Sequence, residues 1–284
     1  MKRYTFIVFV LLFVLSTSLC SQKDSSANPR SSNEIIPPRA KVTYIANEGV
    51  LIEASGKKIL IDGLHRFYND AYAYPPDDLR ERLESATAPY DNLDLIFVSH
   101  LHGDHFHRES VASHLKNSTK AILAASKQIV SEIEKGFAGY DEIKTKISPV
   151  THEWKKSSEE DFGGIKVKFL GLRHGSERFT WIQNLGHLIE VGGKKYLHIG
   201  DADMKAENFE SFKLNNENID VLFVPYWFLQ SAEGRKLVED QFKPKNMIAV
   251  HVSPGEAESV TRELKSLYPE ITVFTKILET KFFD

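Results

Sequence analysis

The sequence predicts a mixed α/β domain with two β-sheets and helices on the outside. Three observations carry this prediction. Apolar runs at hairpin spacing open each half of the chain, near-continuous apolar strands follow them, and helical segments alternate with those later strands. With 284 residues, 42% hydrophobic and 26% charged, the chain has an ordinary globular composition. We place the domain at residues 41–284.

The first half opens with three strands and continues with strands that alternate with helices. Turn signals separate the opening strands at Asn47-Glu48-Gly49 and at Ser55-Gly56. Residues 94–100 are almost continuously apolar, as in a strand buried on both faces. The predicted elements are strands 41–46, 49–54, 57–62, 94–100 and 120–125, and helices 79–83, 107–116 and 127–137.

The second half follows the same order without residue-level similarity to the first. Its later strands are again apolar throughout, which indicates burial on both faces. The short acidic run Glu159-Glu160-Asp161 is interpreted as a solvated loop. The predicted elements are strands 165–172, 186–191, 194–201, 220–226 and 246–252, and helices 230–239 and 255–267.

Residues 1–20 have the layout of an export signal. Lys2 and Arg3 precede an apolar run at residues 6–15, which is shorter than a membrane-spanning helix requires. The run is followed by Cys20, in a segment that resembles the lipidation box of bacterial lipoproteins, although Leu19 stands where Gly or Ala is usual. Cleavage near Ser18 without lipidation is the alternative.

We therefore predict a signal peptide at 1–20, a flexible polar tether at 21–40, and an exported protein. It is expected to be periplasmic or membrane-anchored as a lipoprotein, with the lipid at Cys20 as its membrane contact. Cys20 is the single cysteine, which excludes an intrachain disulfide and a cysteine-based zinc site. With a formal net charge of −3, the chain has no broad positive potential to attract nucleic acids, so we expect no nucleic-acid partner.

Four side chains of the kinds that bind metals fall within six residues at the end of the predicted strand 94–100. They are His100, His102, Asp104 and His105. Strand ends are where α/β architectures place sites, and imidazole and carboxylate ligands suit Zn²⁺, Fe²⁺ or Mn²⁺. One loop cannot fill two metal sites. Three further candidates, His174, Asp201 and His251, each follow another apolar strand.

The run His100-Leu101-His102-Gly103-Asp104-His105, with these later residues, resembles the metallo-β-lactamase fold superfamily of hydrolases. The resemblance implies a four-layer αββα sandwich of two mixed β-sheets, with a dinuclear site at one edge of the sheets. It implies that one metal is held by His100, His102 and His174, and the second by Asp104, His105 and His251, with Asp201 bridging the two. Two Zn²⁺ ions are expected, with Fe²⁺ or Mn²⁺ as alternatives.

The same resemblance implies hydrolysis of an ester-like bond, such as a lactone or thioester, or of a phosphodiester, by a metal-bridging hydroxide. Asp104 is the predicted catalytic residue, which orients the nucleophile or takes its proton. A true β-lactamase is not expected, because those enzymes lack the bridging carboxylate that Asp201 provides here. The expected substrate is a small or lipid-like molecule. The alternatives are a mono-iron oxidoreductase similar to persulfide dioxygenases, and a non-catalytic surface-anchored protein.

Several other residues have more than one interpretation. Asp62 is interpreted either as a buried carboxylate that orients the ligand loop or as a turn residue. His187 and His198 share strand faces with apolar residues and are expected to be packed rather than ligating. The remaining candidates for the cleft or the core are His65, His107 and Tyr226-Trp227-Phe228.

Overall fold

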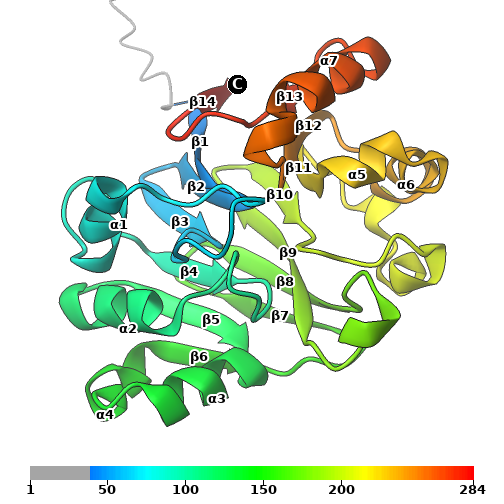
Figure 1. Ribbon diagram of the computed structural model, residues 1–284. Helices are drawn as coiled ribbons and strands as arrows, with labels where there is room; N and C mark the ends of the chain where they lie inside the picture. Colours follow the sequence, from blue (N-terminus) through cyan, green and yellow to red (C-terminus); the bar gives the residue numbers. More distant parts are fainter. Residues whose placement is uncertain (1–38) are drawn as a thin grey trace, which may run out of the picture. The chain divides into compact units, whose positions relative to one another are not determined.

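The computed structural model describes residues 39–284, which form two seven-stranded β-sheets with helices outside them (Figure 1). The predicted signal at 1–20 and nearly all of the predicted tether at 21–40 lie outside the described residues. Both sheets are mixed, as predicted. Within the described part of the chain, no helix has the length and apolar character that a membrane crossing would need.

The first sheet has the strand order β14-β1-β2-β3-β4-β5-β6. Strands β14, β1, β2 and β3 pair antiparallel, and β3 to β6 pair parallel. Asn47 adopts a left-handed backbone with φ of 53° in the tight turn between β1 and β2, a conformation that asparagine tolerates well. The strands are β1 (Ala40–Ala46), β2 (Gly49–Ala54), β3 (Lys57–Ile61), β4 (Leu95–Val98), β5 (Ile122–Ser126), β6 (Ile147–Val150) and β14 (Thr280–Phe283).

The second sheet has the order β13-β12-β11-β10-β9-β8-β7. It repeats the pattern of the first, because β7 to β10 pair antiparallel and β10 to β13 pair parallel. The sequence predicts hairpin strands followed by strands that alternate with helices in each half, but it leaves out the short strands β6, β13 and β14. The strands are β7 (Ser157–Asp161), β8 (Lys166–Leu172), β9 (Asn184–Val191), β10 (Lys194–His198), β11 (Val221–Pro225), β12 (Asn246–Val250) and β13 (Thr272–Val273).

Helices cover the outer face of each sheet (Figure 1). Those packed on the first sheet are α1 (Asp77–Glu84), α2 (Arg108–Asn117), α3 (Lys127–Gly136) and α4 (Tyr140–Ile143). Those on the second are α5 (Tyr226–Gln230), α6 (Ala232–Leu237) and α7 (Ala257–Leu267). Short 3-10 turns lie at Lys144–Lys146, Glu177–Phe179 (η2), Ala206–Asn208, Glu210–Phe212, Leu214–Asn216 and Pro254–Glu256, and a π-helical turn at Val238–Phe242.

Three apolar layers hold these elements together and account for the continuous apolar strands. On β4, Phe97 packs into the layer between the sheets, whereas its neighbour Ile96 packs against the outer helices. On β11, Phe223 and Leu222 divide in the same way. Successive side chains of a strand point to opposite faces, so a strand covered on both faces needs apolar residues at every position. The predicted αββα sandwich is confirmed.

The helix expected near 230–239 is present as α6 and the π-helical turn after it, and it begins after Ser231, whose hydroxyl accepts a hydrogen bond from the Gly234 amide. One prediction about local structure is wrong. Glu159-Glu160-Asp161 belongs to an edge strand, β7, and not to a loop. All five residues of β7 are exposed, so the strand has no apolar alternation to reveal it, and it is held by antiparallel pairing with β8.

The core between the sheets contains a histidine, His187 on β9. Its ring stacks on Phe97 with 4.8 Å between the ring centroids, and neither ring nitrogen has a hydrogen-bond partner within residues 39–284. Burial lowers the pKa of His187 to about 3. In the unfolded chain the His187 imidazole becomes protonated below about pH 6.5, whereas in the folded chain it stays neutral down to about pH 3. The free energy of unfolding therefore decreases as the pH falls from 6.5 towards 3.

We expect the substitution His187→Phe to remove this pH dependence. Relative to the wild type, the variant should gain about 2 kcal/mol in the free energy of unfolding between pH 7.5 and pH 5, because the unfavourable term grows by about 1.4 kcal/mol per pH unit below 6.5. Urea unfolding of both proteins at the two pH values measures the change. An unfolding difference between the proteins that is the same at both pH values would contradict it.

Candidate metal centre

Seven His and Asp side chains meet where strands of both sheets end. The ligand-type loop follows β4, His174 follows β8, Asp201 follows β10 and His251 follows β12. A β-bridge between His174 and Ala202, with a 2.7 Å hydrogen bond from the Gly175 amide to the Asp201 carbonyl, fixes two of these segments to each other. The structure thus brings all the predicted ligands together, and they fall into two groups of donors. The groups match the prediction except that Asp201, predicted as the bridge, falls with the first of them: His100, His102, His174 and Asp201, and Asp104, His105 and His251.

In the first group, three imidazole nitrogens surround one point. His102 Nδ1 lies 3.1 Å from His100 Nε2 and 3.1 Å from His174 Nε2. Asp201 Oδ2 lies 3.9 Å from His100 Nε2 and 3.6 Å from His174 Nε2. Tetrahedral zinc with ligand bonds near 2.1 Å separates its donor atoms by about 3.4 Å, so these spacings fit one such ion.

The second group has the same spacing. Asp104 Oδ2 lies 3.4 Å from His105 Nε2 and 3.3 Å from His251 Nε2. The other oxygen of Asp201, Oδ1, lies 3.6 Å from His105 Nε2 and 3.5 Å from His251 Nε2. The two oxygens of Asp201 therefore face the two groups separately, which is the arrangement that a bridging carboxylate requires.

The charges of the site fit bound cations. His251 Nε2 and Asp201 Oδ1 are buried and have no hydrogen-bond partner among the described residues. Burial lowers the pKa of His174 to about 4, which keeps its ring in the neutral form that binds metal. Burial opposes a charge on His251 as well, but Asp201 and Asp104 raise its pKa to about 10. A cation would replace that proton and satisfy both carboxylates.

Asp62 holds the ligand loop in place through hydrogen bonds to Ser99 and His105. One carboxylate oxygen accepts the Ser99 amide at 2.7 Å, and the other accepts the Ser99 hydroxyl at 2.5 Å. The second oxygen also lies 2.9 Å from His105 Nδ1, a contact that fixes the ring with Nε2 towards the second group. Asp62 is buried, as the first of its two interpretations predicts.

Sequence reasoning missed two residues of the β1–β2 turn, Asn47 and Glu48. Asn47 Nδ2 donates hydrogen bonds to Asp104 Oδ2 at 3.0 Å and to the Asp104 backbone carbonyl at 3.2 Å. The backbone carbonyl of Asn47 accepts a hydrogen bond from the His251 amide at 2.9 Å. Glu48 is buried, and neither carboxylate oxygen has a hydrogen-bond partner among the residues that the structure describes. Its Oε2 lies 3.6 Å from His198 Nε2. In the sequence these residues signal only a turn, and nothing there shows that the turn contacts the ligand loop.

His65, His107, His187 and His198 lie outside the two groups of predicted ligands. His65 is buried, and His107 Nδ1 accepts the Ser110 amide at 3.3 Å and caps α2. His187 and His198 oppose each other on β9 and β10, and neither belongs to a ligand group. Neither His65 nor His107 lines the cavity at the site.

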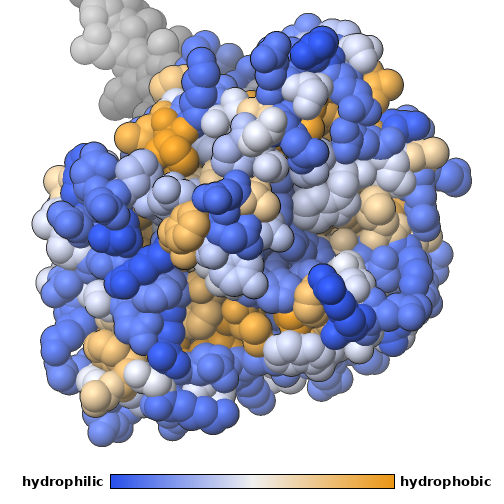
Figure 2. All heavy atoms as spheres, viewed as in Figure 1, coloured by the Kyte–Doolittle hydropathy of each residue, from blue (hydrophilic) through white to orange (hydrophobic). Residues whose placement is uncertain are grey.

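A cavity of about 510 Å³ opens onto the site. Five of the predicted ligands line it, together with Tyr226 and Trp227 of α5, whereas Phe228 packs into the core. Of the candidates Tyr226-Trp227-Phe228, the first two therefore belong to the cleft and the third to the core. The face of the molecule drawn in Figure 2 is mostly hydrophilic. The full set of lining residues is Tyr68, Ala71, Tyr72, His102, Asp104, His174, Gly175, Arg178, Phe179, Asp201, Tyr226, Trp227, His251, Ser253 and Glu256.

The αββα sandwich, with metal-ligand side chains gathered at the ends of its strands, is typical of hydrolases of the metallo-β-lactamase fold. Comparisons with known proteins place the chain in the same class. The chain belongs to the beta-lactamase superfamily domain family, whose sequence profile matches residues 58–277. A UPF0173 metal-dependent hydrolase of Bacillus cereus is 30% identical over 223 residues, covering 74% of this chain and 85% of that protein. One of Pelotomaculum thermopropionicum is 26% identical over 218 residues, covering 74% and 83%.

A solved structure shares the fold. Igni18, described as a novel metallo hydrolase from the archaeon Ignicoccus hospitalis, superposes with a TM-score of 0.59 at 18% identity, covering 86% of this chain and 98% of that one. The chain is thus a metal-dependent hydrolase of the metallo-β-lactamase fold, as the sequence predicts.

Gly200 sets the position of Asp201. Its φ is 54°, and a Cβ atom there would lie 2.5 Å from Asn184 Oδ1 and 2.8 Å from Ser99 Cβ. We expect Gly200→Ala to destabilise the fold by about 2 kcal/mol or more and to weaken metal binding, since both the strain and the clash move Asp201. Urea unfolding and zinc titration measure the two effects.

Gly193 offers a matched control for this substitution. Its φ is 74°, also left-handed, but a Cβ atom there meets nothing within 4 Å. Gly193→Ala should cost only about 1 kcal/mol, from backbone strain, and leave metal binding unchanged. Equal effects of the two substitutions on metal binding would show that Gly200 does not position Asp201.

Proposed function

We propose that this chain binds two zinc ions and hydrolyses an ester-like bond, such as a lactone or thioester, or a phosphodiester. The observation that carries the proposal is the pair of donor groups faced separately by the two oxygens of Asp201. Bound zinc supplies Lewis-acid activation of water at neutral pH and electrostatic stabilisation of developing negative charge. Fe²⁺ and Mn²⁺ are the alternative ions for the same ligand set.

The chain's own residues supply positioning and proton transfer in this proposal. Asp104 lines the cavity and is held by the Asn47 amide, so its carboxylate is available to orient the attacking water or to take its proton. Asp62 holds His105 in one tautomer and one orientation through the 2.9 Å contact with Nδ1. The aromatic residues Tyr72 and Trp227 line the cavity and contact the His251 ring from two sides of the chain's fold.

The complete second donor group argues against the one-iron oxidoreductase considered from the sequence. Asp104, His105 and His251 lie close enough to hold an ion that a mono-iron enzyme would not need. A non-catalytic protein is disfavoured for a related reason, because all seven predicted ligand positions retain donor side chains with metal-binding spacing.

A substrate panel tests the proposal. The metal-stripped chain, reconstituted with zinc, is assayed with a lactone, a thioester and bis(4-nitrophenyl) phosphate. We expect hydrolysis of at least one substrate, lost with a chelator and restored by zinc. A chain that binds two equivalents of zinc and hydrolyses none of the three classes would contradict the proposed chemistry.

We further propose that the protein is exported and anchored by a lipid on Cys20. The support lies in the sequence, where Lys2 and Arg3 precede an apolar run followed by the only cysteine. In a bacterial host, the wild type should fractionate with membranes and Cys20→Ser should appear in the soluble fraction. Detection of both proteins in the soluble fraction would contradict the anchor and favour simple secretion.

A further inference from the structure

Aromatic residues from three separate segments line the cavity above the site. Tyr72, in the segment between β3 and α1, contacts His251 edge to face with ring centroids 5.3 Å apart. Trp227 of α5 contacts the same imidazole at 4.8 Å. Beside the first group of predicted ligands, the ring centroid of Phe179 of η2 lies 4.7 Å from that of His102. These rings continue the walls outward from the predicted ligands and suit an apolar or flat part of a substrate.

The tyrosine-bearing segment is seated on the ligand loop itself. A Cβ atom on Gly103 would lie 2.8 Å from Tyr68 Cδ2, so the Tyr68 ring rests directly on the glycine between His102 and Asp104. Tyr68 and Tyr72 also contact each other, with ring centroids 5.8 Å apart. The aromatic wall is thus built onto the site and is not a separate surface feature.

The cavity has one lysine or arginine among its lining residues, Arg178. Its guanidinium lies over the Phe179 ring, 4.4 Å from the centroid. Among the described residues no carboxylate forms an ion pair with it. The one lining acid that is not a predicted ligand, Glu256, accepts a hydrogen bond from the Tyr226 hydroxyl at 3.2 Å. Arg178 is therefore an exposed cation beside an aromatic ring, without a carboxylate partner in the part of the chain that the structure describes.

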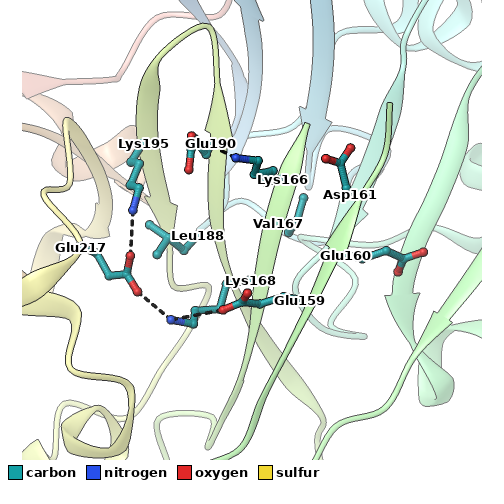
Figure 3. Close-up of a pocket in the computed structure, with 10 residues that line it drawn as sticks. All are labelled: Glu159, Glu160, Asp161, Lys166, Val167, Lys168, Leu188, Glu190, Lys195 and Glu217. Carbon is teal, nitrogen blue, oxygen red and sulfur yellow. Dashed lines mark hydrogen bonds and ion pairs between the residues drawn. The ribbon is translucent and has the colours of Figure 1, made fainter. Parts of the chain in front are cut away.

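A second hollow on the same sheet carries lysines and acids that pair with one another. It has a volume of about 450 Å³ and lies on the outer side of β7 to β10 (Figure 3). Lys168 contacts Glu217 at 2.6 Å and Lys195 contacts the same carboxylate at 2.8 Å, while Lys166 lies 3.7 Å from Glu190 (Figure 3). Its lysines are paired with neighbouring acids, in contrast to Arg178.

We infer that the substrates of this site carry an anionic group on an apolar or aromatic body. Arg178 binds the anionic group through charge-assisted hydrogen bonds, and Phe179, Trp227 and Tyr72 contact the body. The inference rests on the proposed function only in placing the scissile bond at the metal centre. The recognised group is a carboxylate, sulfonate or phosphate, for which a guanidinium has the matching fork of donors.

Two unreactive probes of the same shape test the inference without catalysis. They are 2-naphthalenesulfonate, which is anionic, and its N,N-dimethylsulfonamide, which is neutral. Calorimetric titration of the full, zinc-loaded chain measures both affinities for the wild type and for Arg178→Gln. We expect Arg178→Gln to weaken sulfonate binding about tenfold, the effect of one lost charge-assisted contact at a partly solvated site, and to change binding of the neutral probe by less than about twofold.

Two further variants complete the test. Arg178→Lys should retain part of the sulfonate affinity, since it keeps the charge and loses the fork geometry. Arg262→Gln removes an arginine of α7 that pairs with Glu258 and does not line the cavity, and it should leave both affinities unchanged. A tenfold sulfonate loss confined to Arg178→Gln supports the inference even if the chain hydrolyses no substrate of the panel, which would contradict the proposed function alone.

The opposite results overturn it. Equal sulfonate affinity in the wild type and Arg178→Gln would show that Arg178 binds no anion. Equal losses for both probes would show that Arg178 only supports the Phe179 ring. The absence of saturable sulfonate binding to the wild type at millimolar concentrations would overturn it as well.

Discussion

Replacing Asp201 with alanine is expected to lower the bound metal from two equivalents per chain to one or fewer, and to reduce hydrolysis on the order of a hundredfold or more. The reason is the position of its two oxygens, 3.6 Å from His174 Nε2 on one side and 3.5 Å from His251 Nε2 on the other. Without this carboxylate, two divalent cations would face each other with too little negative charge between them. Elemental analysis of the purified variant measures the loss.

Asp62→Ala is the control for this substitution. Asp62 is also a buried carboxylate close to the site, but it contacts Ser99 and His105 Nδ1 and belongs to neither of the two groups that divide the predicted ligands. Its loss should weaken metal affinity through the orientation of His105 and leave two ions bound at saturating zinc. If Asp201→Ala instead retains two metals and full activity, Asp201 is not the bridge.

Replacing His174 with alanine is expected to remove one ion and to make thermal stability depend on added zinc. His174 Nε2 faces the first group, 3.1 Å from His102 Nδ1, and no other histidine of the described chain joins that group besides His100 and His102. A ligand that binds only the folded state stabilises it by mass action, so a weakened site should show a melting temperature that rises with zinc concentration. Metal content and thermal melting are measured together.

His187→Phe is the matched control for His174→Ala. His187 lies between the sheets against Phe97 and outside both donor groups, so the control should bind zinc like the wild type. The opposite pattern, with metal lost from His187→Phe and kept by His174→Ala, would show that the wrong middle histidine has been assigned.

The sequence predicts the layers of this fold because strands buried on both faces are apolar at nearly every position. On β4, Ile96 and Phe97 serve two different cores, and the resulting continuous apolar run is readable without a structure. The hairpin order is readable as well, since turn residues such as Asn47 interrupt the opening strands at short intervals. Edge strand β7 has no such apolar run, because all five of its side chains face solvent.

The site was predictable where ligands cluster in sequence or end an apolar strand. His100, His102, Asp104 and His105 lie within six residues, so their clustering is visible in the sequence, and His174 and His251 follow strands that can be recognised. The contacts around them depend on tertiary packing. Asn47 meets Asp104 across 57 positions of the chain, and Tyr68 rests on Gly103 from a segment with no regular structure. No local pattern encodes such contacts.

Elemental analysis combined with X-ray absorption spectroscopy tests the dinuclear centre most directly, on the full chain purified without chelators. The separate orientation of the Asp201 oxygens towards two donor groups predicts two equivalents of zinc per chain, with metal–metal scattering at about 3.5–4 Å. A single equivalent of iron with no metal–metal scattering would contradict the centre and favour a mono-iron oxidoreductase.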